Sequence, residues 1–271
     1  MLPEAAQRLE KAVTRSQRRS SVNFPIGFVR WDDGDTPPLA RVMRGGQGGE
    51  SRLRVYLLLR LMATAPPHTV TVSARELARD LGIDADGTDA GARRVNASLK
   101  ALGGRRGNTG LASGPAIPPL LSFSDRPGLT RTIQILDPAG SGQPWNDREI
   151  QSPYVTMPLS LYRKGWLLAL SGRAVAILLV LRELTGGRAE DRGWADGIRK
   201  RQYGFSDDTW TRGTKELADR GLLTVDSDIL ISQGEPRRRN RYQLNLDNLE
   251  HWHPFENPDD PMHERRWKPT T

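Results

Sequence analysis

The sequence predicts an α+β fold, mostly α-helical, made of two similar halves in tandem. The order helix, helix, helix and β-hairpin occurs twice along the chain. Residues 138–152, which are rich in glycine and proline, separate the two copies as a linker would. The length of 271 residues also exceeds the usual size of one domain, about 100–150 residues. Together these observations predict two compact domains.

Residues 1–50 precede the first copy and are expected to form a basic arm followed by a glycine-rich linker. Residues 45–49 supply the glycines, whereas residues 22–31 are too short to fold alone and are expected to add a strand to a neighbour. The start of the arm allows two alternatives, a disordered tail that seeks phosphates or an amphipathic helix for self-association. The basic positions of the arm are Arg8, Lys11, Arg15, Arg18 and Arg19.

The first copy, residues 51–137, begins with a helix whose apolar side chains recur at three- and four-residue spacing. A pair of prolines ends this helix, and a short β-prone run follows. Ser73 and Glu76 then form the pattern of a capping box, which opens a second helix. Gly82 is expected to end that helix as a C-cap.

The third helix of the first copy is expected at residues 89–102, with Val95 and Leu99 on its buried face. Two β-prone segments, residues 120–123 and 129–136, then form a hairpin. Helix, strand, helix, helix and hairpin in this order make a winged helix.

The second copy, residues 153–247, repeats the order with an apolar helix at residues 171–184 and a short helix at residues 194–202. Ser206 is expected to cap the next helix, residues 207–220, whose first-turn acids suit the helix dipole. An arginine-rich loop at residues 232–241 is expected between the last two strands of this copy. The predicted strands are residues 222–225, 229–231 and 242–246.

Two tandem winged-helix domains, with a basic N-terminal arm and a C-terminal tail at residues 248–271, predict a protein that binds double-stranded DNA. The third helix of a winged helix enters the major groove, because that groove is wide enough and shows a distinct pattern for each base pair. The net charge of +8 agrees with nucleic acid as the partner.

In the second domain, Arg212 is the candidate for reading a guanine, because a guanidinium can donate two hydrogen bonds to that base. The groove-facing positions of this domain are Thr209, Thr211, Arg212 and Lys215. The wing positions, expected to follow phosphates or enter the minor groove, are Arg237, Arg238, Arg239, Asn240 and Arg241. A basic group on the preceding helix consists of Arg199, Lys200 and Arg201.

In the first domain the sequence evidence for DNA binding is weaker. Its groove-facing positions are Arg93, Arg94, Asn96 and Lys100. Its expected contacts to the DNA backbone are Arg105, Arg106, Arg126 and Arg131. An alternative is that this domain only packs or dimerises, because winged helices also serve as protein-interaction modules.

The sequence does not predict an enzyme, a cofactor or a metal site. The chain has no cysteine, which excludes disulfides and cysteine-based zinc fingers, and it has neither a phosphate-binding glycine loop nor a nucleophile elbow. The triplet His251-Trp252-His253 resembles the metal-binding signature of rolling-circle nucleases, but Pro254 follows at once and Tyr242 lies upstream. A metal-dependent nicking enzyme is therefore the weakest alternative. We expect a cytoplasmic protein without a membrane partner.

The segment from Tyr203 to Leu223, with the arginine-rich wing and Tyr242, resembles winged-helix domains of bacterial regulators. The tandem layout resembles the winged-helix replication initiators of plasmids and phages. The resemblance implies a plasmid- or nucleoid-associated protein that marks or melts an origin and recruits replication proteins, or that represses its own promoter as a homodimer. An adaptor in a chromosome-organising or defence complex is the alternative from another class.

Overall fold

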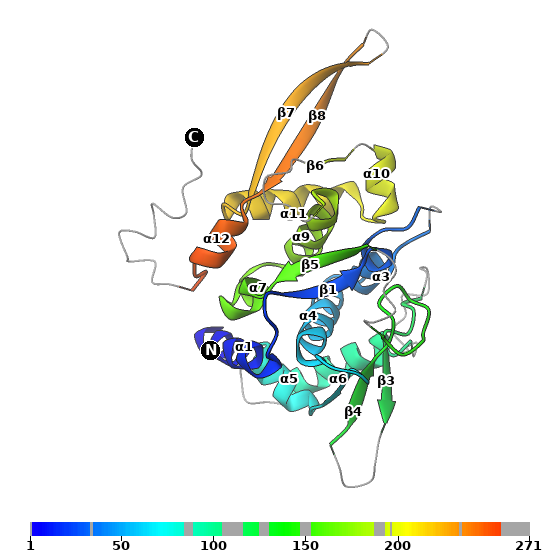
Figure 1. Ribbon diagram of the computed structural model, residues 1–271, viewed down its shortest axis with the longest axis vertical. Helices are drawn as coiled ribbons and strands as arrows, with labels where there is room; N and C mark the ends of the chain where they lie inside the picture. Colours follow the sequence, from blue (N-terminus) through cyan, green and yellow to red (C-terminus); the bar gives the residue numbers. More distant parts are fainter. Residues whose placement is uncertain are drawn as a thin grey trace.

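A computed structural model of the chain describes residues 2–32, 35–83, 89–104, 116–124, 130–146, 153–186, 193–195, 197–232 and 235–255. The protein is a mixed α/β fold in which helices predominate and the strands form small antiparallel sheets (Figure 1). In the described part of the chain, no helix is both long and apolar enough to cross a membrane.

The first unit, residues 47–135, follows the predicted order of elements. Ser73 caps α5 through the backbone N–H of Glu76, and the Glu76 carboxylate accepts from the backbone N–H of Ser73, which confirms the capping box. Gly82 follows this helix with a φ of 61°, as a C-cap requires. The three strands pair in the order β2-β4-β3. The elements are α4 (Gln47–Met62), β2 (Thr69–Thr71), α5 (Ala74–Asp80), α6 (Ala90–Leu102), β3 (Leu121–Ser124) and β4 (Thr132–Ile135).

The second unit, residues 172–244, repeats this order and the same sheet topology, β6-β8-β7. The Ser206 hydroxyl accepts from the backbone N–H of Thr209 at the start of α11, as predicted from its position. Gly221 follows that helix with a φ of 67°. The elements are α9 (Gly172–Leu184), β6 (Gly193–Trp194), α10 (Gly197–Gln202), α11 (Asp207–Asp219), β7 (Leu223–Ser232) and β8 (Glu235–Leu244).

Two predictions for the second unit are wrong in detail. Residues 194–202 do not form one helix, because Gly193 and Trp194 pair with Tyr242 and Arg241 of β8 and only α10 is helical. The arginine-rich stretch is not a loop but strand β8, paired with β7 from Leu223↔Leu244 to Ser232↔Glu235. The valine and isoleucine residues of β7 favour an extended strand. The hairpin is therefore longer than a hairpin with a loop at residues 232–241 would be.

The expectation of an arm over residues 1–50 is corrected, since this segment is folded onto both units. Helix α1 buries Ala5, Leu9, Ala12 and Val13, so its apolar face is covered by this chain and not by a second copy. Strand β1 pairs antiparallel with β5, which lies in the second half of the sequence. The glycines expected as a linker lie partly in the first turn of α4. These elements are α1 (Leu2–Ser16), β1 (Ser21–Pro25), α2 (Ile26–Val29), α3 (Pro38–Met43) and β5 (Tyr154–Pro158).

The two units share one hydrophobic core, because α4 packs directly against α9. Glu50 of α4 accepts from the backbone N–H of Gly172 at 3.0 Å, and Arg54 donates to the carbonyl of Leu170 at 2.9 Å. Glu216 of α11 accepts from the backbone N–H of Ser171, so both units contribute a carboxylate to the N-terminus of α9. The remaining described helices are α7 (Ser160–Arg163), α8 (Trp166–Ala169) and α12 (Leu246–His251).

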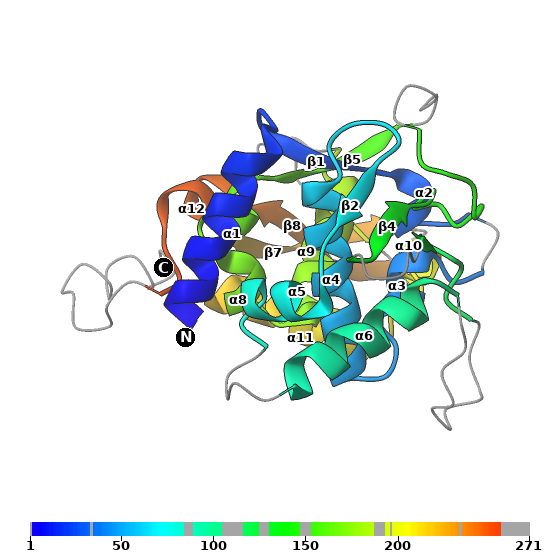
Figure 2. The same ribbon diagram turned by 90° about the horizontal axis from the view of Figure 1, so that it is seen from below.

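The two units are arranged along the long axis of the molecule. The β7–β8 hairpin extends from one end and the β3–β4 hairpin from the other (Figure 1). Viewed from below, α6 and α11 both lie along the lower edge of the molecule (Figure 2). One side of the protein therefore carries the third helix of each unit, with a hairpin at either end.

Candidate nucleic-acid interface

Helix α6 presents a basic face to solvent. Arg93, Arg94, Asn96 and Lys100 are exposed, as predicted, whereas Val95 on the opposite face is fully buried. The first turn of the helix holds no acid, and Asp89 before it is paired with Arg75 at 2.7 Å. The hydrogen bond from the Arg75 guanidinium lowers the pKa of the Asp89 carboxyl. The cations of α6 are thus exposed on a helix that has no carboxylate of its own.

Helix α11 is positioned by Trp210, which is buried between α10 and β8. Its indole N–H donates to the hydroxyl of Tyr242 at 3.0 Å, and the two rings meet edge to face. The Tyr203 ring is tilted against the Trp210 ring, with 6.0 Å between the ring centroids. Gly213 faces Ile177 of α9, where a Cβ would lie 2.6 Å from Ile177 Cγ1. The helix therefore rests on aromatic rings on one flank and on a close helix contact beneath.

The solvent face of α11 is less basic than the sequence suggests. Thr211, Arg212 and Lys215 are exposed, whereas Thr209 is partly buried near the cap. The Arg212 Nε lies 2.8 Å from Asp208, and the Lys215 Nζ lies 2.6 Å from Asp219. Such surface pairs one turn apart contribute only about 0.3–0.5 kcal/mol, so a phosphate or a base can displace the carboxylate at little cost.

The hairpin of the second unit carries its arginines on strand β8. Arg241 and Asn240 are exposed, and the Arg239 guanidinium lies 4.1 Å from the centre of the Trp194 ring of β6. In the strand register, Arg241 lies opposite Asp226 and Arg239 opposite Asp228, so acids of β7 accompany the basic strand. Arg237 and Arg238 occupy the outer half of β8, opposite Leu230 and Ile229.

The three basic residues of α10 differ in their surroundings. Arg199 interacts with Tyr203, whose pKa is raised above its ordinary value by burial and by the neighbouring Glu183. The Lys200 ammonium lies 5.2 Å from the centre of the Trp210 ring, and Arg201 is exposed. Arg201 is therefore more accessible to a ligand than Arg199 or Lys200.

The hairpin of the first unit is described only in part. Arg131 lies just before β4 with its guanidinium 5.4 Å from the centre of the Phe123 ring. Arg126, expected at the tip, and Arg105 and Arg106 after α6 lie outside the described residues.

The histidine triplet lies where α12 ends. His253 Nε2 is 2.7 Å from the ammonium of Lys164, and Trp252 packs against Gly221. Within the described residues, no three histidine, aspartate or glutamate side chains are close enough together to hold a metal ion. Tyr242, the tyrosine that a nicking mechanism would need, is buried beside Trp210. The triplet therefore docks the last described residues onto the domain surface.

Two features of the structure were not predicted from the sequence. Trp194 is 38% exposed and supports Arg239, although the sequence pattern predicted a helix there. A cleft between α1 and α5 also gathers basic side chains, and the spacing of Arg8, Lys11 and Arg15 along one helix face was its only signal.

Comparisons of the chain with protein-family models, with curated proteins and with solved structures gave no significant match. The candidate interface therefore depends on the geometry of this chain alone.

Proposed function

We propose that this chain is a sequence-specific double-stranded DNA-binding protein built from two winged-helix domains. The roles that best fit such a protein are those of a replication initiator or a transcriptional regulator of a bacterial plasmid or other mobile element. Binding and positioning constitute its action, and no catalytic step is part of the proposal.

The observation that carries the proposal is the doubled topology. In each unit the strand that comes third along the chain, β4 or β8, lies between the other two strands of its sheet. The helix that precedes the hairpin, α6 or α11, follows a short helix and has an exposed face. This is the arrangement in which winged-helix proteins place a recognition helix in the major groove and a hairpin on the flanking backbone. The shared side of α6 and α11 supports simultaneous contact with one duplex (Figure 2).

The two helices are expected to contribute differently. Arg93, Arg94 and Lys100 supply exposed positive charge for phosphates and guanine edges, with Asn96 as a candidate for adenine. On α11, Arg212 has to exchange Asp208 for a DNA group, which makes its contact depend on the bound sequence. Arg239 and Arg241 of the hairpin are expected to follow the backbone outside the groove.

A protein-interaction adaptor is the second candidate, and the charge balance on α11 favours it. Asp207, Asp208 and Asp219 accompany Arg212 and Lys215 on this helix, so its exposed face is nearly neutral. In that case α6 alone would contact DNA, and α11 would bind a protein partner.

Selection from a random duplex pool tests the proposed function directly. The full chain is incubated with the pool at low salt, and enriched duplexes are then titrated by fluorescence anisotropy at increasing salt. We expect saturable binding that prefers the enriched sequence, with log affinity falling linearly against log salt. Phosphate contacts remain strong at about 50 mM salt. The proposal is overturned if no sequence is enriched and no duplex is bound at that concentration.

A further inference from the structure

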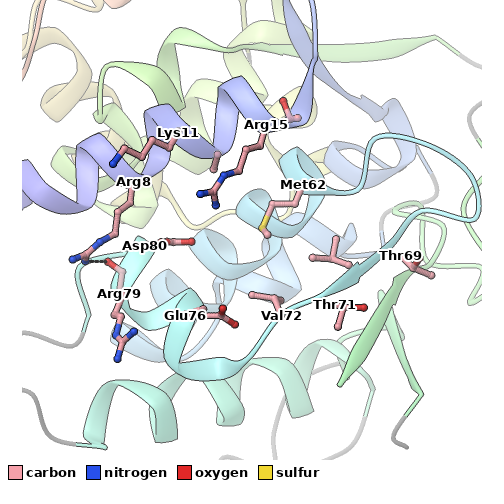
Figure 3. Close-up of a pocket in the computed structure, with 13 residues that line it drawn as sticks. Arg8, Lys11, Arg15, Met62, Thr69, Thr71, Val72, Glu76, Arg79 and Asp80 are labelled. Atoms are coloured by element: carbon pink, nitrogen blue, oxygen red, sulfur yellow. Dashed lines mark hydrogen bonds between the residues drawn. The ribbon is translucent and has the colours of Figure 1, made fainter. Parts of the chain in front are cut away.

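A cleft of about 630 Å³ opens between α1, β2 and α5, and its lining includes no residue of α6 or α11. Figure 3 shows Arg8, Lys11 and Arg15 reaching from α1, with Arg79 and Asp80 on the facing helix α5. The size lies within the range typical of small-ligand sites, about 300–1,000 Å³. This cleft belongs to neither recognition helix.

The cations of the cleft come from two separate elements. Arg8, Lys11 and Arg15 recur at three- and four-residue spacing, so they share one face of α1, next to the buried Ala12 and Ser16 that line the same cleft. Within the described residues, neither Lys11 nor Arg15 makes a hydrogen bond or an ion pair within 4 Å. Figure 3 shows the Arg15 side chain directed into the space between the two helices.

The acids of the cleft offset this charge only in part. Four cationic side chains and two carboxylates line it. The Glu76 carboxylate is held in the capping box by the backbone and the hydroxyl of Ser73. Burial raises the pKa of Asp80, although Arg8, Arg15 and Arg79 act in the opposite direction. The cleft therefore keeps an excess of positive charge.

The floor of the cleft is apolar. Val70 and Val72 are buried there, Met62 is partly buried, and Thr69 and Thr71 add hydroxyl groups at the edge. A cationic wall over an apolar floor suits a ligand with phosphate at one end and a flat or apolar group at the other.

We propose that this cleft binds a phosphorylated ligand of nucleotide size, with its phosphates beside Lys11 and Arg15 of α1. The same chemistry is offered by a free nucleotide and by the terminal nucleotides of a DNA strand. The ligand bridges α1 and α5, and α5 precedes α6 in the first unit. The proposal does not depend on duplex binding by α6 and α11.

Isothermal titration of the full chain with pyrophosphate, ADP and the 5′-phosphorylated dinucleotide pTpT tests this site. We expect saturable binding of at least one probe with one site per chain. Lys11→Ala/Arg15→Ala should weaken it roughly tenfold or more, because the variant removes both cations that would form charge-assisted hydrogen bonds to the phosphates. The probe that binds most tightly identifies the source, pTpT for a DNA strand and ADP or pyrophosphate for a free ligand.

The matched control is Arg19→Ala/Arg163→Ala, which removes two exposed cations that do not line the cleft. We expect this variant to bind the probes as the wild type does. Absence of saturable binding for all three probes overturns the proposal, as does an equal loss in the two double variants. Because α1 keeps its buried face in Lys11→Ala/Arg15→Ala, an unchanged circular dichroism spectrum separates a lost site from a lost fold.

Discussion

Replacing both arginines of α6, Arg93→Ala/Arg94→Ala, is expected to weaken duplex binding about a hundredfold, since each such contact contributes roughly 1–3 kcal/mol. Both side chains are exposed, and neither forms an ion pair within 4 Å in the part of the chain that the structure describes, so the loss reflects contacts to DNA rather than to the protein. Fluorescence anisotropy against the selected duplex at several salt concentrations measures the effect. The slope of log affinity against log salt should also become shallower.

The control for this experiment is again Arg19→Ala/Arg163→Ala, which removes the same charge from positions outside α6 and α11. We expect its affinity to stay within about threefold of wild type, because only the long-range field changes. Equal losses in the two variants would mean that net charge, and not the face of α6, governs binding.

Gly213→Ala is expected to destabilise the protein by about 1–2 kcal/mol, because overpacking a tight contact costs more than the helix propensity of alanine returns. The added Cβ would lie 2.6 Å from Cγ1 and 3.1 Å from Cβ of Ile177 and 3.2 Å from the carbonyl oxygen of Arg173, and the last two of these atoms cannot move without the backbone of α9. Urea unfolding followed by circular dichroism measures the change. Duplex affinity should fall as well, because α11 has to shift away from α9.

Gly197→Ala is the matched control, since a Cβ at that position of α10 meets nothing within 4 Å. We expect its unfolding midpoint to equal or slightly exceed that of the wild type. Equal stability of the Gly213→Ala and Gly197→Ala variants would show that α11 is not positioned by its close packing on α9.

Local signals in the sequence predicted the order of the helices in both units. The capping box at Ser73, the cap at Ser206 and the helix end at Gly82 are all confirmed. Each depends on residues within one or two turns of the helix end, so it can be recognised without knowledge of the rest of the fold.

The parts that could not be predicted depend on contacts distant in sequence. The pairing of β1 with β5 joins residues more than a hundred positions apart, and no local pattern in either strand specifies its partner. The burial of α1 likewise depends on surfaces of α4, α5 and α7. An amphipathic pattern predicts that a helix has a partner, but it does not say which one.

The structure also changes which of the two candidate recognition helices is the stronger candidate. Arg212 was the first candidate reader in the sequence, yet Asp208 one turn earlier pairs with it. In the sequence, Arg93 and Arg94 are weaker candidates for DNA contacts than Arg212, although no acid in the first turn of α6 faces them. The four-residue spacing of Asp208 and Arg212 permits such a pair on a helix, but only the side-chain geometry shows it formed.

Hydroxyl-radical footprinting of the full chain on its selected duplex tests the central claim most directly. With α6 and α11 on one side of the molecule, we expect two protected clusters on one face of the duplex, about one helical turn or 10–10.5 base pairs apart. Protection from the hairpins should extend beyond each cluster. A single protected cluster, or none on a duplex that the protein binds, would contradict recognition by two tandem winged helices.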